Sequence, residues 1–461
     1  MAELIDRKIY TDRIKGFFEK EVDLIKVITG IRRSGKSEIL KLVREEALKR
    51  TDNGHVIFIN FELFEFADIV SAKELHDYIT ALMKDNKKYY IFLDEIQRVK
   101  DWEKAVISLR LKNTDIYITG SNAKLLSGEL ATLIAGRYIS FEVYPLSFGE
   151  FNHFRIVSGI EKNPNDLNET LDNYIKTGGF PLLSVKSFTE TEAREVVSDI
   201  NSSAVLKDVI ERNKISNVSL LQRLISFIYD NIGRLVSVRS IEAYLKNNGG
   251  GNFETISNYL AYLENACIIK KAPRYEIKGK KLLESNDKYY LADHSLQYAI
   301  RDMKEENMPG ILENIVFNEL VRRGYNVYVG KMSKDDNREI DFVAEKFGGD
   351  EKIYVQVCYD YSLSETRDRE FVPLTEIKDH YPKYVVAYRM LGKDNVNGVV
   401  GIQLKDFLLK DKFKRGGYIL CKSQLTARWQ AARAALRRNF QNGWAFRALI
   451  PARFTAASGF S

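Results

Sequence analysis

Apolar runs and helical repeats alternate along the first 150 residues of the chain. Five short apolar runs have the length of strands, and the stretches between them repeat apolar residues at the spacing of a helix. The expected strands are residues 26–29, 55–62, 88–95, 115–119 and 138–143, and the expected helices are residues 38–48, 72–83 and 102–109. Runs that are apolar throughout are typical of parallel strands buried on both faces. The pattern therefore predicts an α/β domain built on a parallel sheet.

The pattern changes twice further along the chain. Residues 165–215 are helical and polar, which suits a small helical lid on the first domain. Three helical repeats and two short strands follow, at residues 220–232, 238–245, 254–263, 267–270 and 274–278. Three helices before a two-stranded wing resemble a winged helix, and helix and strand patterns alternate again over residues 310–410. We therefore expect domains at residues 1–215, 216–303 and 304–410, followed by an atypical tail at residues 411–461.

A glycine loop separates the first strand from the first helix. Its residues are Gly30, Ile31, Arg32, Arg33, Ser34, Gly35, Lys36 and Ser37. They have the Gly-x-x-x-x-Gly-Lys-Ser spacing of a phosphate-binding loop, in the strand–loop–helix context that this motif requires. Gly30 and Gly35 let the backbone turn close to phosphates, and the amino end of the helix attracts negative charge. We expect Lys36 to reach the β- and γ-phosphates of ATP and the Ser37 hydroxyl to ligate Mg²⁺. The alternative, a plain glycine turn, is weaker because spacing and context agree.

Two acids end the third apolar run. Asp94 and Glu95 follow residues 90–93, at the carboxyl end of an expected central strand. In a site with a phosphate-binding loop, Asp94 would hold Mg²⁺ and Glu95 would polarise the attacking water. Taken alone, the pair reads as solvated acids capping a strand, but the loop upstream favours the catalytic interpretation.

Further candidates lie beside the fourth and fifth strands. Ser121 or Asn122 follows the fourth strand and would sense the γ-phosphate or, equally well, cap a helix. Arg137 precedes the fifth strand and would stabilise γ-phosphate charge, either in cis or across a subunit interface. A surface salt bridge is the alternative for Arg137.

Several of these segments together resemble a group of prokaryotic AAA-family ATPases. The matching segments are Gly30-Ile-Arg-Arg-Ser-Gly-Lys-Ser37, Phe92-Leu-Asp-Glu-Ile-Gln97, Thr119-Gly-Ser-Asn122 and Gly136-Arg137 followed by Tyr144-Pro-Leu-Ser-Phe148. The resemblance covers residues 1–410 and implies an AAA-type P-loop core with a Walker A loop, a Walker B strand and a sensor. It also implies a carboxyl-terminal domain of unknown function related to nucleases.

The two later domains suggest partners other than ATP. Thr255, Ser257, Asn258 and Tyr262 would face outward from the third helix of the winged-helix pattern, and Lys278, Lys280 and Lys281 form its basic tip. Such groups can contact DNA bases and phosphates, although winged helices in ATPases also serve as lids packed on the core. Residues 310–410 resemble the PD-(D/E)XK nuclease fold, with Glu313, Asp341 and Gln356 at the expected Mg²⁺-binding positions. Cys358 stands where that fold has a lysine, and a neutral thiol cannot supply the charge, so we expect a degenerate fold used for binding.

Charge and cysteine content add little to this prediction. The net charge is +7, but the six arginines of residues 423–461, which contain no Asp, Glu or Lys, leave only +1 for the rest. A basic average is therefore poor evidence for nucleic-acid binding, and the composition of this tail indicates a frame-shifted or fused end. The three cysteines lack the spacing of a metal site, and no apolar run reaches membrane-spanning length, so we expect a cytoplasmic protein.

Two functions remain open at this stage. The first is an ATPase that couples hydrolysis of Mg-ATP to recognition of a partner, either DNA or a protein, by its carboxyl-terminal domains. The second is a nucleotide-dependent binding module with negligible turnover. The pair Asp94 and Glu95 favours the first, because a pure switch does not need the second acid. If Arg137 acts across a subunit interface, the protein is a homo-oligomer.

Overall fold

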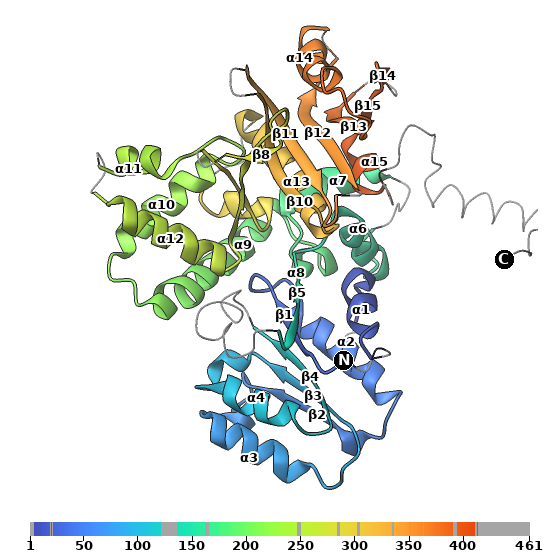
Figure 1. Cartoon of the computed structure of the whole chain (residues 1–461), viewed down its shortest axis with the longest axis vertical. Helices are drawn as coiled ribbons and strands as arrows, with labels where there is room; N and C mark the ends of the chain where they lie inside the picture. The colour runs from blue at the N-terminus through green and yellow to red at the C-terminus, as the bar shows by residue number, and fades with distance from the viewer. Residues whose placement is uncertain are drawn as a thin grey trace, which may run out of the picture. The chain divides into compact units, whose positions relative to one another are not determined.

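The computed structural model describes residues 4–413, except 19, 21, 121–135, 162–165, 247–249, 284–285, 302–304, 334–335, 350, 363, 391–393 and 411–412. Residues 1–409 form one compact unit, which Figure 1 follows from blue to red. The unusual tail, residues 423–461, lies outside the described residues. Within the described part of the chain, no helix is both long and apolar enough to cross a membrane.

A five-stranded sheet forms the first part of the unit. Its strands are β1 (Ile25–Thr29), β2 (Val56–Asn60), β3 (Tyr89–Asp94), β4 (Thr114–Thr119) and β5 (Tyr138–Glu142). They pair in parallel in the order β2-β3-β4-β1-β5. Parallel strands leave the sheet at one edge, so the loops that follow β1, β3 and β4 meet there. The predicted α/β class and parallel sheet are confirmed.

Helices cover both faces of this sheet (Figure 1). They are α1 (Lys8–Lys15), α2 (Lys36–Leu48), α3 (Ala72–Leu82) and α4 (Trp102–Arg110). Alternate strand residues point to opposite faces, so Val27 belongs to one apolar core with α3 and α4, and Ile28 to another with α1 and α2. Burial on both faces explains why the central strands β1, β3 and β4, which are buried almost throughout, are mainly apolar.

The amino end of β2 carries a histidine between two acids. His55 Nδ1 lies 2.7 Å from Asp52 Oδ1, and His55 Nε2 lies 3.0 Å from Asp85 Oδ1. The hydrogen bond with Asp52, and then that with Asp85, raises the pKa of His55 above its usual value. The folded state thus holds this proton more tightly than the unfolded chain does. The resulting stabilisation is complete below about pH 6.5 and is lost as the pH rises through the raised pKa.

We therefore expect His55→Gln to lower the urea midpoint of unfolding clearly at about pH 5.5 and much less at about pH 9. His153→Gln, which changes an exposed histidine, serves as the control and should alter neither midpoint. A deficit of His55→Gln that grows as the pH rises would contradict this assignment.

A helical region follows the parallel sheet. Its helices are α6 (Phe148–Val157), α7 (Leu167–Thr177), α8 (Pro181–Val185), α9 (Glu190–Ala204), the π-helix η5 (Val205–Glu211), α10 (Val218–Asp230), α11 (Val238–Lys246) and α12 (Phe253–Asn265). Capping boxes fix the start of two of them, since Ser147 and Glu150 bond reciprocally before α6 and Thr189 and Glu192 do so before α9. The three helices predicted for the winged-helix pattern are present as α10, α11 and α12.

The two-stranded wing predicted after these helices is wrong in its pairing. The two predicted strands are β6 (Ile269–Ala272) and β7 (Arg274–Glu276), and they do not pair with each other. Instead, β6 pairs with β9 (Lys288–Leu291), whereas β7 joins a second large sheet. Only Pro273 separates β6 from β7, and a hairpin needs at least a two-residue turn.

The second large sheet has eight strands in the order β14-β15-β13-β12-β11-β10-β7-β8. Its remaining strands are β8 (Lys281–Leu282), β10 (Asn326–Ser333), β11 (Asp336–Glu345), β12 (Lys352–Asp360), β13 (Lys383–Arg389), β14 (Asp394–Val396) and β15 (Val399–Gln403). Parallel and antiparallel pairs are mixed. Three helices accompany it, α13 (Met308–Arg322), α14 (Ser364–Thr375) and α15 (Leu404–Leu408), besides the short 3₁₀ turns η6 (His294–Ala299) and η7 (Glu305–Asn307).

Candidate nucleotide site

The loop between β1 and α2 has the backbone that its two glycines permit. Gly30 has a φ of 138°, and a Cβ atom there would lie 2.1 Å from the carbonyl oxygen of Val143. Gly35 has a φ of 94° and caps the amino end of α2. A side chain at Gly30 would collide with backbone, and L-residues rarely adopt either conformation. The glycines therefore allow the loop to fold tightly over the end of the sheet, with α2 starting at Lys36.

Lys36 lies within the curve of the loop. Its Nζ atom donates to the carbonyl oxygens of Gly30, at 3.0 Å, and Ile31, at 2.9 Å, and the residue is only 5% exposed. Burial lowers the pKa of Lys36, and the charge of Glu95 opposes that shift. A buried ammonium held by loop carbonyls is well placed to exchange them for phosphate oxygens.

Asp94 and Ser37 meet beside this loop. Asp94 Oδ1 accepts hydrogen bonds from Ser37 Oγ, at 3.1 Å, and from Thr119 Oγ1, at 2.5 Å. Asp94 Oδ2 is buried and has no hydrogen-bond partner among the described residues. Burial raises the pKa of Asp94, although the bonds from Thr119 and Ser37 oppose this. A buried oxygen without a partner is costly, so a hydroxyl and a carboxylate in this arrangement fit Mg²⁺, which prefers oxygen ligands.

Glu95 is held from two sides. Its backbone N–H donates to Thr119 Oγ1 at 3.0 Å, and Gln97 Nε2 donates to its carboxylate at 2.5 Å. Glu95 has a φ of 57°, a conformation that is uncommon outside glycine and costs about 1–3 kcal/mol. Thr119 and Gln97 thus position the acids, although sequence reasoning had given them no role. Both lie in segments that carry the family resemblance, at the end of β4 and just after the acid pair, and these places are the signals that point to them.

The π-helix η5 contacts the loop through a largely buried ion pair. Arg32 donates to both carboxylate oxygens of Asp208, at 2.6 and 3.1 Å, and Asp208 is 2% exposed. Arg212 lies one helical turn further on, where burial lowers its pKa although the charge of Asp208 opposes that shift. A spacing of four residues on one helix face, as between Asp208 and Arg212, is typical of an exposed ion pair. The structure instead buries Asp208 and ties it to Arg32 in the loop.

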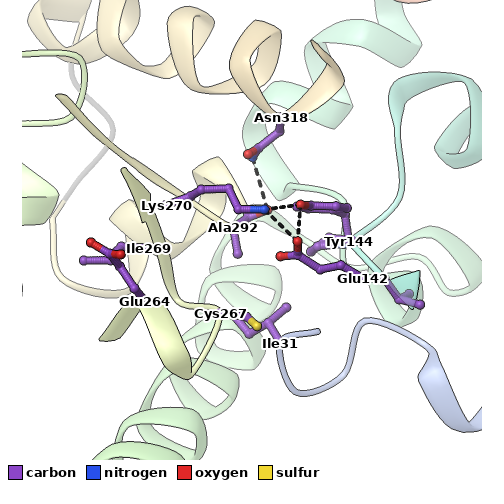
Figure 2. Close-up of a pocket in the computed structure, with 11 residues that line it drawn as sticks. Ile31, Glu142, Tyr144, Glu264, Cys267, Ile269, Lys270, Ala292 and Asn318 are labelled. Carbon is purple, nitrogen blue, oxygen red and sulfur yellow. Dashed lines mark hydrogen bonds and ion pairs between the residues drawn. The ribbon is translucent and has the colours of Figure 1, made fainter. Parts of the chain in front are cut away.

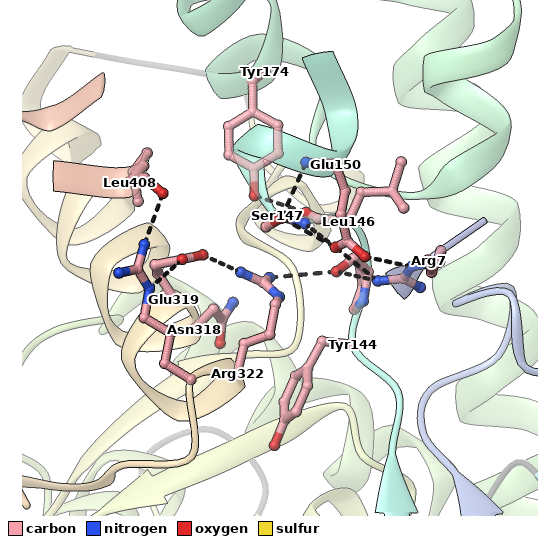
Figure 3. Close-up of polar contacts among 12 residues, drawn as sticks. Arg7, Tyr144, Leu146, Ser147, Glu150, Tyr174, Asn318, Glu319, Arg322 and Leu408 are labelled. Carbon is pink, nitrogen blue, oxygen red and sulfur yellow. Dashed lines mark hydrogen bonds and ion pairs between the residues drawn. The ribbon is translucent and has the colours of Figure 1, made fainter. Parts of the chain in front are cut away.

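Two buried arginines, Arg7 and Arg322, form a network of polar contacts beside the loop (Figure 3). Arg7 donates to the carbonyl oxygen of Ser34 at 2.7 Å and forms a bidentate pair with Glu150. Arg7 also reaches the carbonyl oxygen of Pro145, which accepts a second bond, of 3.3 Å, from Arg322 in α13. Removing one partner of such a buried pair typically costs about 3–5 kcal/mol. The phosphate-binding loop is thus connected through three hydrogen-bonded steps to the helix of the mixed sheet.

A narrow pocket lies where the loop meets the strands after α12 (Figure 2). Ile31 of the loop lies beside Cys267, and Lys270 from β6 bonds Glu142 at 2.7 Å and also the hydroxyl of Tyr144. The carboxyl end of β5 is therefore fixed to the region that follows α12.

The other predicted site residues have different outcomes. Ser121 and Asn122 lie outside the described residues. Arg33 is exposed, with a φ of 64°, at the outer turn of the loop. Arg137 is exposed at the amino end of β5, where its carbonyl oxygen accepts from Ile25 at the start of β1. The loop follows the opposite end of β1, so the interpretation of Arg137 as a γ-phosphate ligand in cis is wrong.

The acids predicted for the later sheet are brought together. Glu313 lies on α13, Asp341 on β11 and Gln356 on β12, and the N–H of Asp341 donates to Gln356 Oε1 at 3.2 Å. Cys358 is buried in the apolar core around α14, and burial raises the pKa of its thiol. Cys358 therefore supplies no positive charge beside Glu313, Asp341 and Gln356.

The chain matches models of known protein families, and the match over its first part agrees with this geometry. The model of an AAA domain matches residues 23–152, and that of a domain of unknown function (DUF8612) matches residues 168–307. The Walker-type ATPase PABY2304 of Pyrococcus abyssi superposes with a TM-score of 0.45 at 16% identity, covering 64% of this chain and 96% of that one.

Two relatives extend the similarity over most of the chain. An uncharacterized protein of Haemophilus influenzae is 39% identical over 411 residues, which are 88% of this chain and 99% of that protein. An uncharacterized protein of Methanocaldococcus jannaschii is 33% identical over 384 residues, 81% of this chain and 80% of that protein. The chain therefore belongs to the same family as these two proteins, and its first part is an AAA-type P-loop ATPase domain.

Proposed function

We propose that the protein binds ATP with Mg²⁺, hydrolyses it, and couples hydrolysis to recognition of a macromolecular partner. Lys36 and the loop amides bind the β- and γ-phosphates, and the amino end of α2 adds favourable electrostatics. Ser37 and Asp94 would hold the Mg²⁺ ion, which when bound neutralises charge on the phosphates. Glu95 orients the attacking water and accepts its proton.

The position of Glu95 carries this proposal. Glu95 follows directly on Asp94, its charge acts on Lys36, and both Thr119 and Gln97 hold it in place. A module that only switched between nucleotide states would not need a second, positioned acid. This favours turnover over the alternative, a nucleotide-dependent binding module with negligible hydrolysis.

The coupling to the later regions rests on the contacts of the loop. Asp208 reaches the loop from the lid through Arg32, and Arg322 reaches it from α13 through Pro145 and Arg7. A loop that changes on binding ATP would alter both sets of contacts. We propose that the region of α10–α12 and the mixed sheet use these contacts to recognise the partner in response to ATP.

Double-stranded DNA is the first partner to test. Asn258 on α12 and the three lysines Lys278, Lys280 and Lys281 after β7 are exposed. We expect DNA to raise steady-state phosphate release from ATP at low salt, and to do so less at high salt because phosphate contacts are salt-dependent. Changing the three lysines to alanine should remove the stimulation and keep the basal rate.

Alanine at the exposed residues Lys73 and Lys104 of the ATPase domain provides the matched control and should leave both rates unchanged. A basal rate that DNA does not alter under any of these conditions would exclude DNA and leave a protein partner as the alternative.

Arg137 keeps one of its two predicted roles as a proposal. It is exposed at the start of β5, an edge strand of the parallel sheet. In a homo-oligomer, this arginine would contact the nucleotide site of a neighbouring subunit.

A further inference from the structure

Three acids of the mixed sheet and its helix converge on one buried lysine. They are Glu313 of α13 and Glu339 and Asp341 of β11, which we call the acid cluster. The ammonium of Lys288 in β9 lies 3.0 Å from Glu313 Oε2, 2.6 Å from Glu339 Oε1 and 3.7 Å from Asp341 Oδ1. Lys288 is only 3% exposed. Because Lys288 is shielded from water, these three carboxylates are the main partners of its charge.

Other groups orient the acid cluster around Lys288. The hydroxyl of Tyr290 donates to Glu313 Oε2 at 2.9 Å, and the N–H of Val357 donates to Asp341 Oδ2 at 2.8 Å. Val357 therefore occupies Oδ2 of Asp341, and the other oxygen, Oδ1, faces Lys288. The arrangement is a built site for a single positive charge.

A divalent cation does not fit this arrangement. Resemblance to the PD-(D/E)XK fold implied that Glu313, Asp341 and Gln356 would hold Mg²⁺. Gln356 Oε1 is instead used by the N–H of Asp341, and the carboxylates converge on the ammonium. Among the residues that the structure describes, no group of three or more His, Cys, Asp or Glu side chains could hold a metal ion.

We infer that the ammonium of Lys288 is the built-in cation of the acid cluster and replaces a metal ion there. The contacts make the cluster a clamp, because β9 belongs to the small sheet with β6 whereas β11 belongs to the eight-stranded sheet. The clamp connects β9, in the small sheet, with α13 and with the eight-stranded sheet. It needs no divalent cation to do so.

The electrostatics of the cluster agree with a permanently charged lysine. Burial alone would lower the pKa of Lys288, but the charges of Glu313, Asp341 and Glu339 outweigh it and raise that pKa. Burial, followed by the charge of Glu313, raises the pKa of Asp341 well above its usual value. The carboxylates therefore favour the charged form of Lys288, whereas burial disfavours ionisation of Asp341.

The test is thermal unfolding of the full chain without nucleotide, with and without Mn²⁺. We expect the wild-type melting temperature not to respond to Mn²⁺. Lys288→Met should lower it by roughly 5 °C or more, and Mn²⁺ should restore part of the loss by taking the place of the ammonium. Lys288→Met combined with Asp341→Asn should not respond to Mn²⁺.

Lys352→Met is the matched control, because Lys352 is a largely buried lysine of the eight-stranded sheet that pairs with Glu345 outside the acid cluster. It should lower stability without any response to Mn²⁺. Stabilisation of the wild type by Mn²⁺ that Asp341→Asn removes would overturn the inference, as would Mn²⁺-dependent cutting of DNA lost in Asp341→Asn. A Lys288→Met protein that melts like the wild type and ignores Mn²⁺ would also overturn it. Should Lys288→Met not fold, the Mn²⁺ response of wild type against Asp341→Asn decides alone.

Discussion

Glu95→Gln is expected to reduce steady-state phosphate release from ATP by about 100-fold or more, whereas its affinity for ATP stays close to that of the wild type. The amide has the size of the carboxylate but cannot accept a proton from water. Its oxygen can still accept the hydrogen bond that Gln97 donates to Glu95, so the site should keep its shape. Loss of turnover without loss of binding separates a catalytic role from a structural one.

Two measurements are needed for this comparison, phosphate release at saturating Mg-ATP and equilibrium binding of ATP. Glu65→Gln is the control, since Glu65 is an exposed acid of the same domain and should not affect either value. Equal rates for wild type and Glu95→Gln would remove Glu95 from the mechanism and favour the binding-module alternative.

Lys36→Ala is expected to weaken ATP binding by roughly 10- to 100-fold, the amount that a lost hydrogen bond to a charged group implies. Lys36 is buried in the loop, and its ammonium has carbonyl partners that phosphate oxygens can replace. Alanine leaves that position without a positive charge. Calorimetric titration with ATP and Mg²⁺ measures the effect directly.

The control for this substitution lies on the same helix. The side chain of Lys41 is 40% exposed and pairs with Glu38 on the surface of α2, so Lys41→Ala removes a lysine without touching the site. Its affinity for ATP should match that of the wild type. Undiminished affinity of Lys36→Ala would mean that the loop does not bind phosphates.

The sheet and the acids of the nucleotide site could be predicted because their signals are local. Residues 90–93 are apolar and are followed directly by Asp94 and Glu95. One short segment of sequence therefore indicates both the strand and the acids at its end. The spacing of Gly30, Gly35 and Lys36 likewise depends only on the turn that the backbone must make. Such patterns survive without any knowledge of the fold.

The contacts that hold the site depend on packing between distant segments. Asp208 is far from Arg32 in sequence, and nothing in its helix distinguishes a buried partner of the loop from an exposed ion pair. The same holds for Lys288, whose three acids come from α13 and β11. The sequence did not predict the pairing of β6 with β9. Only Pro273 separates β6 from β7, which belongs to a different sheet, and a single proline is a weak signal for such a change.

Phosphate release from ATP by the wild-type chain, with Mg²⁺ and after its removal with EDTA, tests the central claim most directly when Lys36→Ala is prepared and measured in parallel. We predict release by the wild type that requires Mg²⁺ and that is absent from Lys36→Ala. The same rate in both preparations, or no release by the wild type, would contradict the proposal that this loop binds ATP for hydrolysis.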